Sequence, residues 1–128
     1  MIYLDHNATT PLDPRVLDAM MPFLTDRFGN AASRHHSLGC DAATATETAR
    51  QQVASTIGAD PREIVWTSGA TESDNLALQG VVNSPVYRKR HLVTVATEHR
   101  AILDTCEALE HRGVAVTYLP VDADGRLD

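Results

Sequence analysis

A run of small and hydroxyl-bearing residues is the part of this sequence best suited to bind a ligand: Thr67-Ser68-Gly69-Ala70-Thr71-Glu72-Ser73-Asp74-Asn75. It follows an apolar stretch at 64–66, so the pattern predicts a strand, a tight loop and the start of a helix. Backbone N–H groups at a helix start have no partner within the helix, and such groups bind anions, phosphate above all. The candidate phosphate donors are the Ala70 and Thr71 amides and the Thr71 hydroxyl. The same pattern equally fits a plain N-cap, with Thr71 or Ser73 capping its own helix.

His99 is the second candidate, because it lies between an expected strand and an expected helix, flanked by Glu98 and Arg100. An imidazole at such a place could stack on a flat ring or exchange protons near neutral pH. Taken alone, its position favours a histidine that caps or packs at the helix start.

Other polar residues give weaker patterns. The segment 5–10 is either a site loop or a series of Asx and Ser/Thr turns. The adjacent pair His35 and His36 has poor geometry for a metal, and no metal site is predicted. Cys106 falls on the apolar face of its expected helix and is assigned to the core. Cys40 has no paired base, so we do not expect it to be a catalytic nucleophile.

Composition limits the class of protein. The chain of 128 residues is 43% hydrophobic, which suits one globular domain with a modest core. A net charge of −6 argues against a nucleic-acid partner. The positive cluster at 88–91 is interpreted as a solvated loop, and it holds Lys89, the sole lysine, which is poorly placed for a Schiff base. Two cysteines, no signal peptide and no apolar run of membrane-spanning length predict a reducing cytoplasm and no membrane partner.

The elements that must position these residues fall into two parts. Residues 1–60 form a helical segment: one helix begins at Asp13 and Pro14 and should kink or end at Pro22, and another spans about 38–57 and stops at Gly58. Small and apolar residues form one stripe on that second helix, which would allow a close neighbour: Ala42, Ala45, Ala49, Val53 and Ile57.

Residues 61–128 alternate between strands at 64–67, 92–96 and 114–119 and helices at 73–82 and 101–112. This βαβαβ order predicts an α/β fold with a mostly parallel sheet, flanking helices and right-handed crossovers. Ligands bind at the carboxyl ends of parallel strands. We therefore expect the 67–71 loop and His99 to open onto the same edge of the sheet and to share one pocket.

Taken together, four motifs occur in an order and spacing that closely resemble the N-terminal part of cysteine desulfurases, in the class V group of pyridoxal-phosphate enzymes. The motifs are Tyr3-Leu4-Asp5-His6-Asn7-Ala8-Thr9-Thr10-Pro11, then Phe28-Gly29-Asn30-Ala31-Ala32-Ser33 with His36 and Gly39, then Thr67 to Leu76, then Thr97-Glu98-His99-Arg100-Ala101. The similarity runs from Ile2 to the last residue.

The resemblance implies part of the large domain of a fold type I transferase, a homodimer and the cofactor pyridoxal 5′-phosphate. It implies that Ala70 and Thr71 bind the cofactor phosphate, and that His99 stacks on the pyridine ring and takes part in proton transfer. It also implies a reaction in which L-cysteine becomes alanine. A loop cysteine of the enzyme takes the sulfur as a persulfide and passes it to an acceptor or iron–sulfur scaffold protein.

The family's Schiff-base lysine, its aspartate facing the pyridine nitrogen and its nucleophilic cysteine all lie beyond the stretch that resembles this chain. The sequence therefore resembles the N-terminal portion of such an enzyme, as a gene fragment, a truncated form or one piece of a split protein, and we expect it to be inactive alone. Two alternatives stay open: another class V enzyme, such as a selenocysteine lyase or an aminotransferase, or a non-catalytic remnant.

Overall fold

The computed structural model describes residues 1–86 and 91–127. The chain divides into two compact units, Met1–Val65 and Trp66–Asp128, which are described in turn. Of the positive cluster at 88–91, residues 88–90, including Lys89, lie outside the described residues, and His91 begins a strand. No helix within the described part of the chain is long and apolar enough to cross a membrane.

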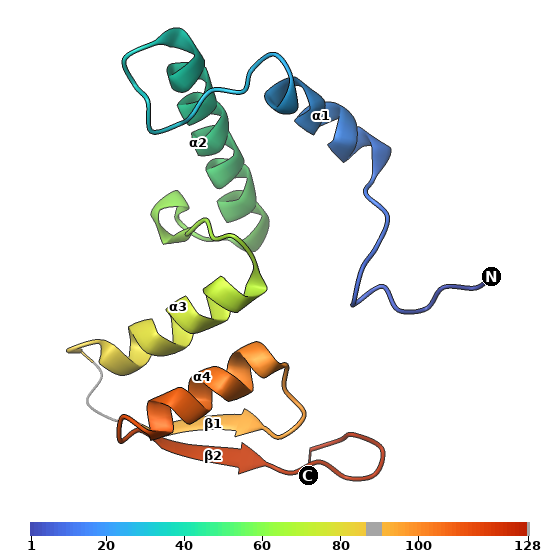
Figure 1. The fold of residues 1–128 in the computed structure, drawn as a ribbon, viewed down its shortest axis with the longest axis vertical. Helices are drawn as coiled ribbons and strands as arrows, with labels where there is room; N and C mark the ends of the chain where they lie inside the picture. The colour runs from blue at the N-terminus through green and yellow to red at the C-terminus, as the bar shows by residue number, and fades with distance from the viewer. Residues whose placement is uncertain (87–90, 128) are drawn as a thin grey trace. The chain divides into compact units, whose positions relative to one another are not determined.

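The first unit begins with an extended segment and the helix α1, Pro14–Leu24 (Figure 1). As predicted, the Asp13 carboxylate caps this helix by accepting the Arg15 N–H at 2.8 Å, and Pro14 occupies the first turn. The helix runs past Pro22 and ends two residues later, where Thr25 is the C-cap. None of its residues is buried, so its apolar side chains remain largely uncovered in the described chain.

The second helix, α2, spans Ser37–Ile57, close to the prediction, and Gly58 ends it in the left-handed conformation with φ 68°. Its first turn lies tight against the preceding loop, because a Cβ on Gly39 would stand 1.6 Å from the Ser33 carbonyl oxygen. The predicted stripe is covered at Ala42, whereas Val53 and Ile57 are exposed. A short 3-10 helix, η1, Pro61–Glu63, follows.

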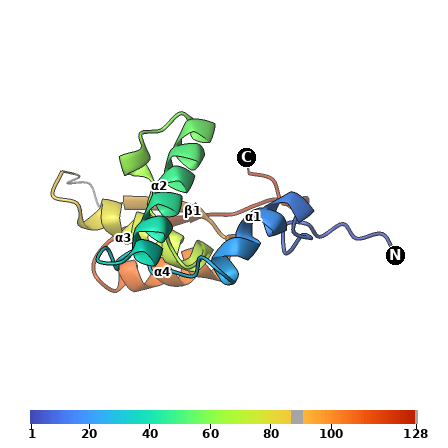
Figure 2. The same ribbon diagram turned by 90° about the horizontal axis from the view of Figure 1, so that it is seen from above.

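The second unit holds α3, Ala70–Asn83, then β1, His91–Val95, then α4, Arg100–Glu110, then β2, Ala115–Leu119. The two strands pair in parallel with His91 opposite Ala115 and Val95 opposite Leu119, as expected for a β–helix–β unit. Helices α3 and α4 contact each other and lie side by side, as Figure 1 and, from above, Figure 2 show. The predicted α/β class, with a parallel sheet and flanking helices, is confirmed.

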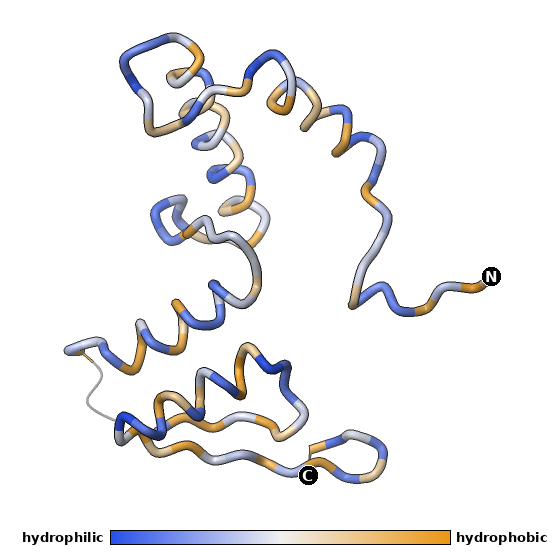
Figure 3. Tube along the Cα trace, viewed as in Figure 1, coloured by the Kyte–Doolittle hydropathy of each residue, from blue (hydrophilic) through white to orange (hydrophobic). Residues whose placement is uncertain are grey.

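A small core joins these four elements. Leu109 of α4, Val82 of α3 and Val114 before β2 are buried together, and Leu78 and Leu92 pack against them. Apolar and polar segments alternate along α4 in the hydropathy colouring of Figure 3, as expected for a helix with one buried face. Cys106 lies on that face and is 1% exposed, which confirms its assignment to the core.

The strand predicted at 64–67 is wrong. Ile64 has extended backbone, but the sheet of the described residues contains β1 and β2 alone. An extended segment becomes a strand only when a neighbouring strand supplies its hydrogen bonds. Here the Ile64 carbonyl instead accepts a hydrogen bond from the Arg50 guanidinium of α2. The predicted βαβαβ order is therefore corrected to βαβ preceded by α3.

Candidate functional site

The start of α3 differs from the sequence prediction in a way that matters for anion binding. The helix begins at Ala70, three residues earlier than predicted, and its N-cap is Gly69, which has no side chain to cap it. The interpretation in which Thr71 or Ser73 caps this helix is thus wrong, because both lie inside it. Among the described residues, the amides of Ala70, Thr71 and Glu72 have no hydrogen-bond partner, and Thr71 is exposed.

Two hydrogen-bonded links fix the loop before this helix. The Thr67 and Ser73 hydroxyls lie 2.6 Å apart, so one donates to the other, and the second donates its own proton to the Gly69 carbonyl, which lies 3.2 Å from both hydroxyls. The Glu72 carboxylate accepts both the Ser68 N–H at 2.7 Å and the Ser68 hydroxyl at 2.6 Å. These bonds from Ser68 lower the pKa of Glu72, so the carboxylate is ionised near neutral pH.

His99 is the N-cap of α4. Its Nδ1 accepts the Ala101 N–H at 3.1 Å, and the side chain is exposed. An imidazole nitrogen that accepts a hydrogen bond carries no proton, so the neutral ring holds its proton on Nε2. The capping role favoured by position is confirmed, and it leaves Nε2–H without a partner among the described residues.

The two helix starts lie at the same end of the second unit. Helices α3 and α4 run in the same direction, opposite to the strands, so both begin where β1 and β2 end (Figure 1). At the opposite end, the Arg112 guanidinium beyond α4 donates to Gln79 at 3.5 Å and Asn83 at 3.3 Å of α3. Thr71, in the first turn of α3, and His99, at the cap of α4, therefore belong to one end of the fold. Free amides at a helix start favour an anion, and an exposed imidazole can stack on a ring or transfer protons.

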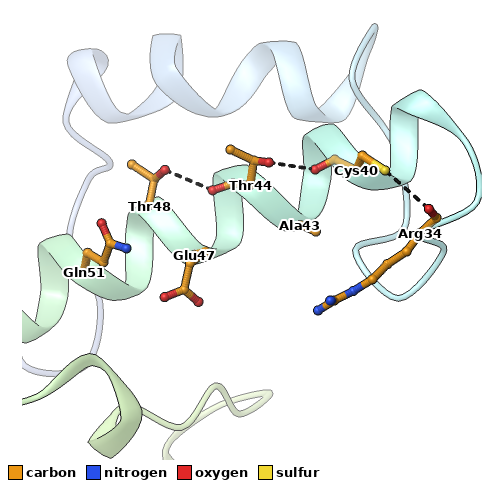
Figure 4. Close-up of a pocket in the computed structure, with 7 residues that line it drawn as sticks. All are labelled: Arg34, Cys40, Ala43, Thr44, Glu47, Thr48 and Gln51. Carbon is orange, nitrogen blue, oxygen red and sulfur yellow. Dashed lines mark hydrogen bonds between the residues drawn. The ribbon is translucent and has the colours of Figure 1, made fainter.

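The remaining candidates do not join this arrangement. Cys40 lies at the first turn of α2 in a shallow hollow along that helix, where its thiol donates to the Arg34 carbonyl at 3.4 Å (Figure 4). No base contacts the thiol among the described residues. His36 caps α2 by accepting the Gly39 N–H. Within the described residues, no three His, Cys, Asp or Glu side chains gather to bind a metal.

The sequence analysis does not predict the hydrogen bonds that the Glu72 carboxylate accepts from Ser68. A signal was present: Glu72 stands three residues after Gly69, the spacing of an N-cap and the N3 acidic residue. With the helix predicted to begin at 73, Glu72 would lie before it and could not be an N3 residue.

Comparison with known proteins gives one family. The model of the family described as Aminotransferase class-V matches residues 2–128. The chain is 58% identical over 127 residues to "Cysteine desulfurase IscS" of Methylococcus capsulatus, and 57% identical to "Cysteine desulfurase, mitochondrial" of Drosophila melanogaster. These matches cover 99% of the chain but 32% and 28% of those relatives, so the chain spans about a third of their length.

Solved structures of cysteine desulfurase-like proteins also match this chain. A "NIFS-like protein" superposes with a TM-score of 0.86 at 42% identity, covering 99% of this chain and 34% of that one. The apo structure of a cysteine desulfurase from Thermococcus onnurineus superposes with a TM-score of 0.82 at 31% identity, covering 99% and 32%. The likeness extends over both units of the chain and confirms the fold expected from the resemblance.

Proposed function

This chain belongs to the aminotransferase class-V family, and from that membership we infer that it forms one side of the cofactor site of a pyridoxal-phosphate-dependent cysteine desulfurase. The identity to relatives named cysteine desulfurases, at 57–58%, favours this activity over other class V reactions. The chain spans about a third of those relatives, so the reaction proposed is that of a whole protein in which these residues take part.

The residues at the start of α3 fit the cofactor's phosphate. Unpartnered amides at Ala70 and Thr71, an exposed hydroxyl on Thr71 and the positive end of the α3 dipole all favour a bound dianion. When bound, pyridoxal phosphate supplies an electron sink for the substrate's bonds. The protein's part is to anchor and orient it: Ala70 and Thr71 would hold the phosphate, and His99 would stack on the ring and hold a proton at Nε2.

We further propose L-cysteine as the substrate, alanine and a protein-bound persulfide as the products, and a sulfur-acceptor or iron–sulfur scaffold protein as the partner. A homodimer and a cytoplasmic location belong to the same proposal. The relatives, bacterial and mitochondrial, are named cysteine desulfurases, which supports the substrate and the products; the homodimer rests on the resemblance of the motifs, and the cytoplasmic location on the sequence composition.

The observation that carries the proposal is the set of free amides at the start of α3, which lies at the same end of the second unit as the exposed His99 ring. Its test is Thr71→Val, which keeps the side-chain shape and removes the hydroxyl. Loss of one hydrogen bond to a charged group costs about 1.5–3 kcal/mol, so the dissociation constant for pyridoxal phosphate should rise roughly 10- to 150-fold. Equilibrium dialysis of the 128-residue chain measures it.

Thr44→Val is the matched control, because the Thr44 hydroxyl bonds only the Cys40 carbonyl within α2. It should leave cofactor affinity unchanged. Equal affinity of the Thr71→Val variant and the parent chain would contradict the assignment of Thr71.

A further inference from the structure

We propose that Arg112 is a positioning residue for the cofactor site. From the far ends of α3 and α4 it fixes how the two helices are aligned, and thereby where Thr71 lies relative to His99. The inference rests on the proposed function, because it concerns two residues that the cofactor would meet together. It adds to that function a residue at the opposite end of the second unit.

Within the described residues, all side-chain hydrogen bonds between α3 and the end of α4 come from Arg112. Its guanidinium donates to the Asn83 side-chain oxygen at 3.3 Å and to that of Gln79 at 3.5 Å. Its own N–H donates to the Leu109 carbonyl at 3.0 Å, which ties it to the last turn of α4. The other contact between the helices is apolar, with Val82 and Leu109 in one core. Apolar contact is non-directional, so the directional Arg112 bonds favour one alignment over small shifts along the helix axes.

A row of amide side chains on α3 continues these bonds toward the start of that helix. The Gln79 side-chain N–H donates to the Asn75 side-chain oxygen at 3.1 Å, and the Asn75 side-chain N–H donates to the Thr71 carbonyl at 2.9 Å. The three residues are spaced by four, so they lie on one face of the helix, and Asn75 and Gln79 are half-buried. An unbroken series of hydrogen bonds therefore runs from Arg112 to the main chain of Thr71.

Arg112 also decides which way each amide in this row points. A guanidinium has donors and no acceptor, so the Gln79 atom that faces it is the oxygen. The Gln79 NH₂ group then faces Asn75, whose oxygen accepts from it and whose NH₂ group bonds the Thr71 carbonyl. Because all these bonds point the same way, each one polarises the next. Without Arg112 both amides can turn over, and the Asn75 oxygen would then face a carbonyl that it cannot bond.

The alignment matters because the proposed site is divided between two helices. Helix α3 supplies the free amides and the Thr71 hydroxyl, and His99 at the start of α4 supplies the ring. An α-helix rises 1.5 Å per residue, so roughly 12 Å of stiff helix separates Thr71 from Gln79, and a shift of α3 at Gln79 is reproduced at Thr71. A ligand that binds at both helix starts loses affinity when their separation changes, whereas a ligand held by α3 alone does not.

The test compares two ligands of different reach in the 128-residue chain. Pyridoxal phosphate has a phosphate and a ring, and inorganic phosphate has only the first. Equilibrium dialysis measures both affinities, with the phosphate as its radiolabelled ion. Arg112→Met keeps an apolar stem and removes every side-chain donor. We expect it to weaken pyridoxal phosphate binding about three- to tenfold and to leave the affinity for inorganic phosphate unchanged.

Two further variants and a control sharpen the comparison. Arg112→Lys should restore part of the lost affinity, because the ammonium group still donates. Gln79→Met interrupts the same row, so it should match Arg112→Met, and the double variant should bind pyridoxal phosphate no more weakly than either single one. Arg126→Met is the matched control: this exposed arginine of the same unit pairs with Asp124 at 3.6 Å in its own turn, and its loss should change neither affinity.

Equal weakening of both ligands by Arg112→Met would overturn the positioning role, because a general loss of structure affects them alike. Unchanged affinity for pyridoxal phosphate, or losses that add in the double variant, would overturn it too. In each case the proposed function stands if Thr71→Val still weakens both ligands. A parent chain that binds pyridoxal phosphate no better than inorganic phosphate would refute both the inference and the stacking role of His99. Thr71→Val without effect on either ligand would refute the proposed function itself.

Discussion

Replacing His99 should separate two roles carried by different atoms of one ring. Nδ1 caps α4 through the 3.1 Å bond from the Ala101 amide, whereas the proposed chemistry uses Nε2 and the ring face. Removing an N-cap costs about 1 kcal/mol, within a range of roughly 0.5–2. Because α4 supplies the buried core residues Cys106 and Leu109, loss of its N-cap should destabilise the whole second unit. His99→Ala should then lower the melting temperature by about 4–8 °C.

Asparagine is the matched replacement, because it is among the best N-cap residues and has no imidazole. His99→Asn should melt within about 2 °C of the parent, while both variants slow cysteine-dependent sulfide release in a complete protein that carries this chain. Circular dichroism at the helix band gives the melts, and sulfide colorimetry gives the rates. Equal destabilisation by Ala and Asn would refute the capping argument. A full rate in His99→Asn would refute the role of the ring.

Three further predictions concern residues of the second unit and of α2. Leu109→Ala, at a site 1% exposed, should cost about 3 kcal/mol in urea unfolding. A thiol reagent should modify the exposed Cys40 at once, and Cys106 only on unfolding, since burial raises the pKa of Cys106 and hides it. Partial burial and the hydrogen bond to Glu110 raise the pKa of Tyr118 to about 12. The neutral phenol therefore stabilises the fold fully below pH 10 and loses that contribution between pH 10 and 12; Tyr118→Phe should abolish this alkaline loss in pH-dependent melts.

Capping and terminating residues in the sequence correctly predicted where α1 begins and where α2 ends. Asp13 with Pro14 and the left-handed Gly58 mark helix ends through interactions within a few residues, and the structure places α1 and α2 accordingly. The stretch 64–67 was predicted as a strand from composition, and this failed because pairing depends on a neighbour elsewhere in the chain. Val65 and Trp66 are exposed here, although their types are those of a strand.

The starts of α3 and α4 lie at one end of the second unit, but for a different reason from the one predicted, and the shared pocket of the 67–71 loop and His99 stays a prediction. That prediction assumed that 64–67 and 92–96 were adjacent parallel strands, whose carboxyl ends must coincide. In the structure the first strand is absent, and the alignment comes from α3 packing parallel to α4, with Val82 and Leu109 in one core. Parallel helices bring their N-termini together as parallel strands bring their carboxyl ends.

The sequence does not predict which residue the Glu72 carboxylate contacts. Whether Glu72 accepts from the N-cap amide or from the residue before it depends on the backbone of the loop, and the N3 spacing is the same in both cases, as Glu63 shows. That choice decides whether the Gly69 amide is occupied or open. Which backbone amide the carboxylate occupies therefore depends on a difference of one residue in its reach, and the sequence spacing does not show that difference.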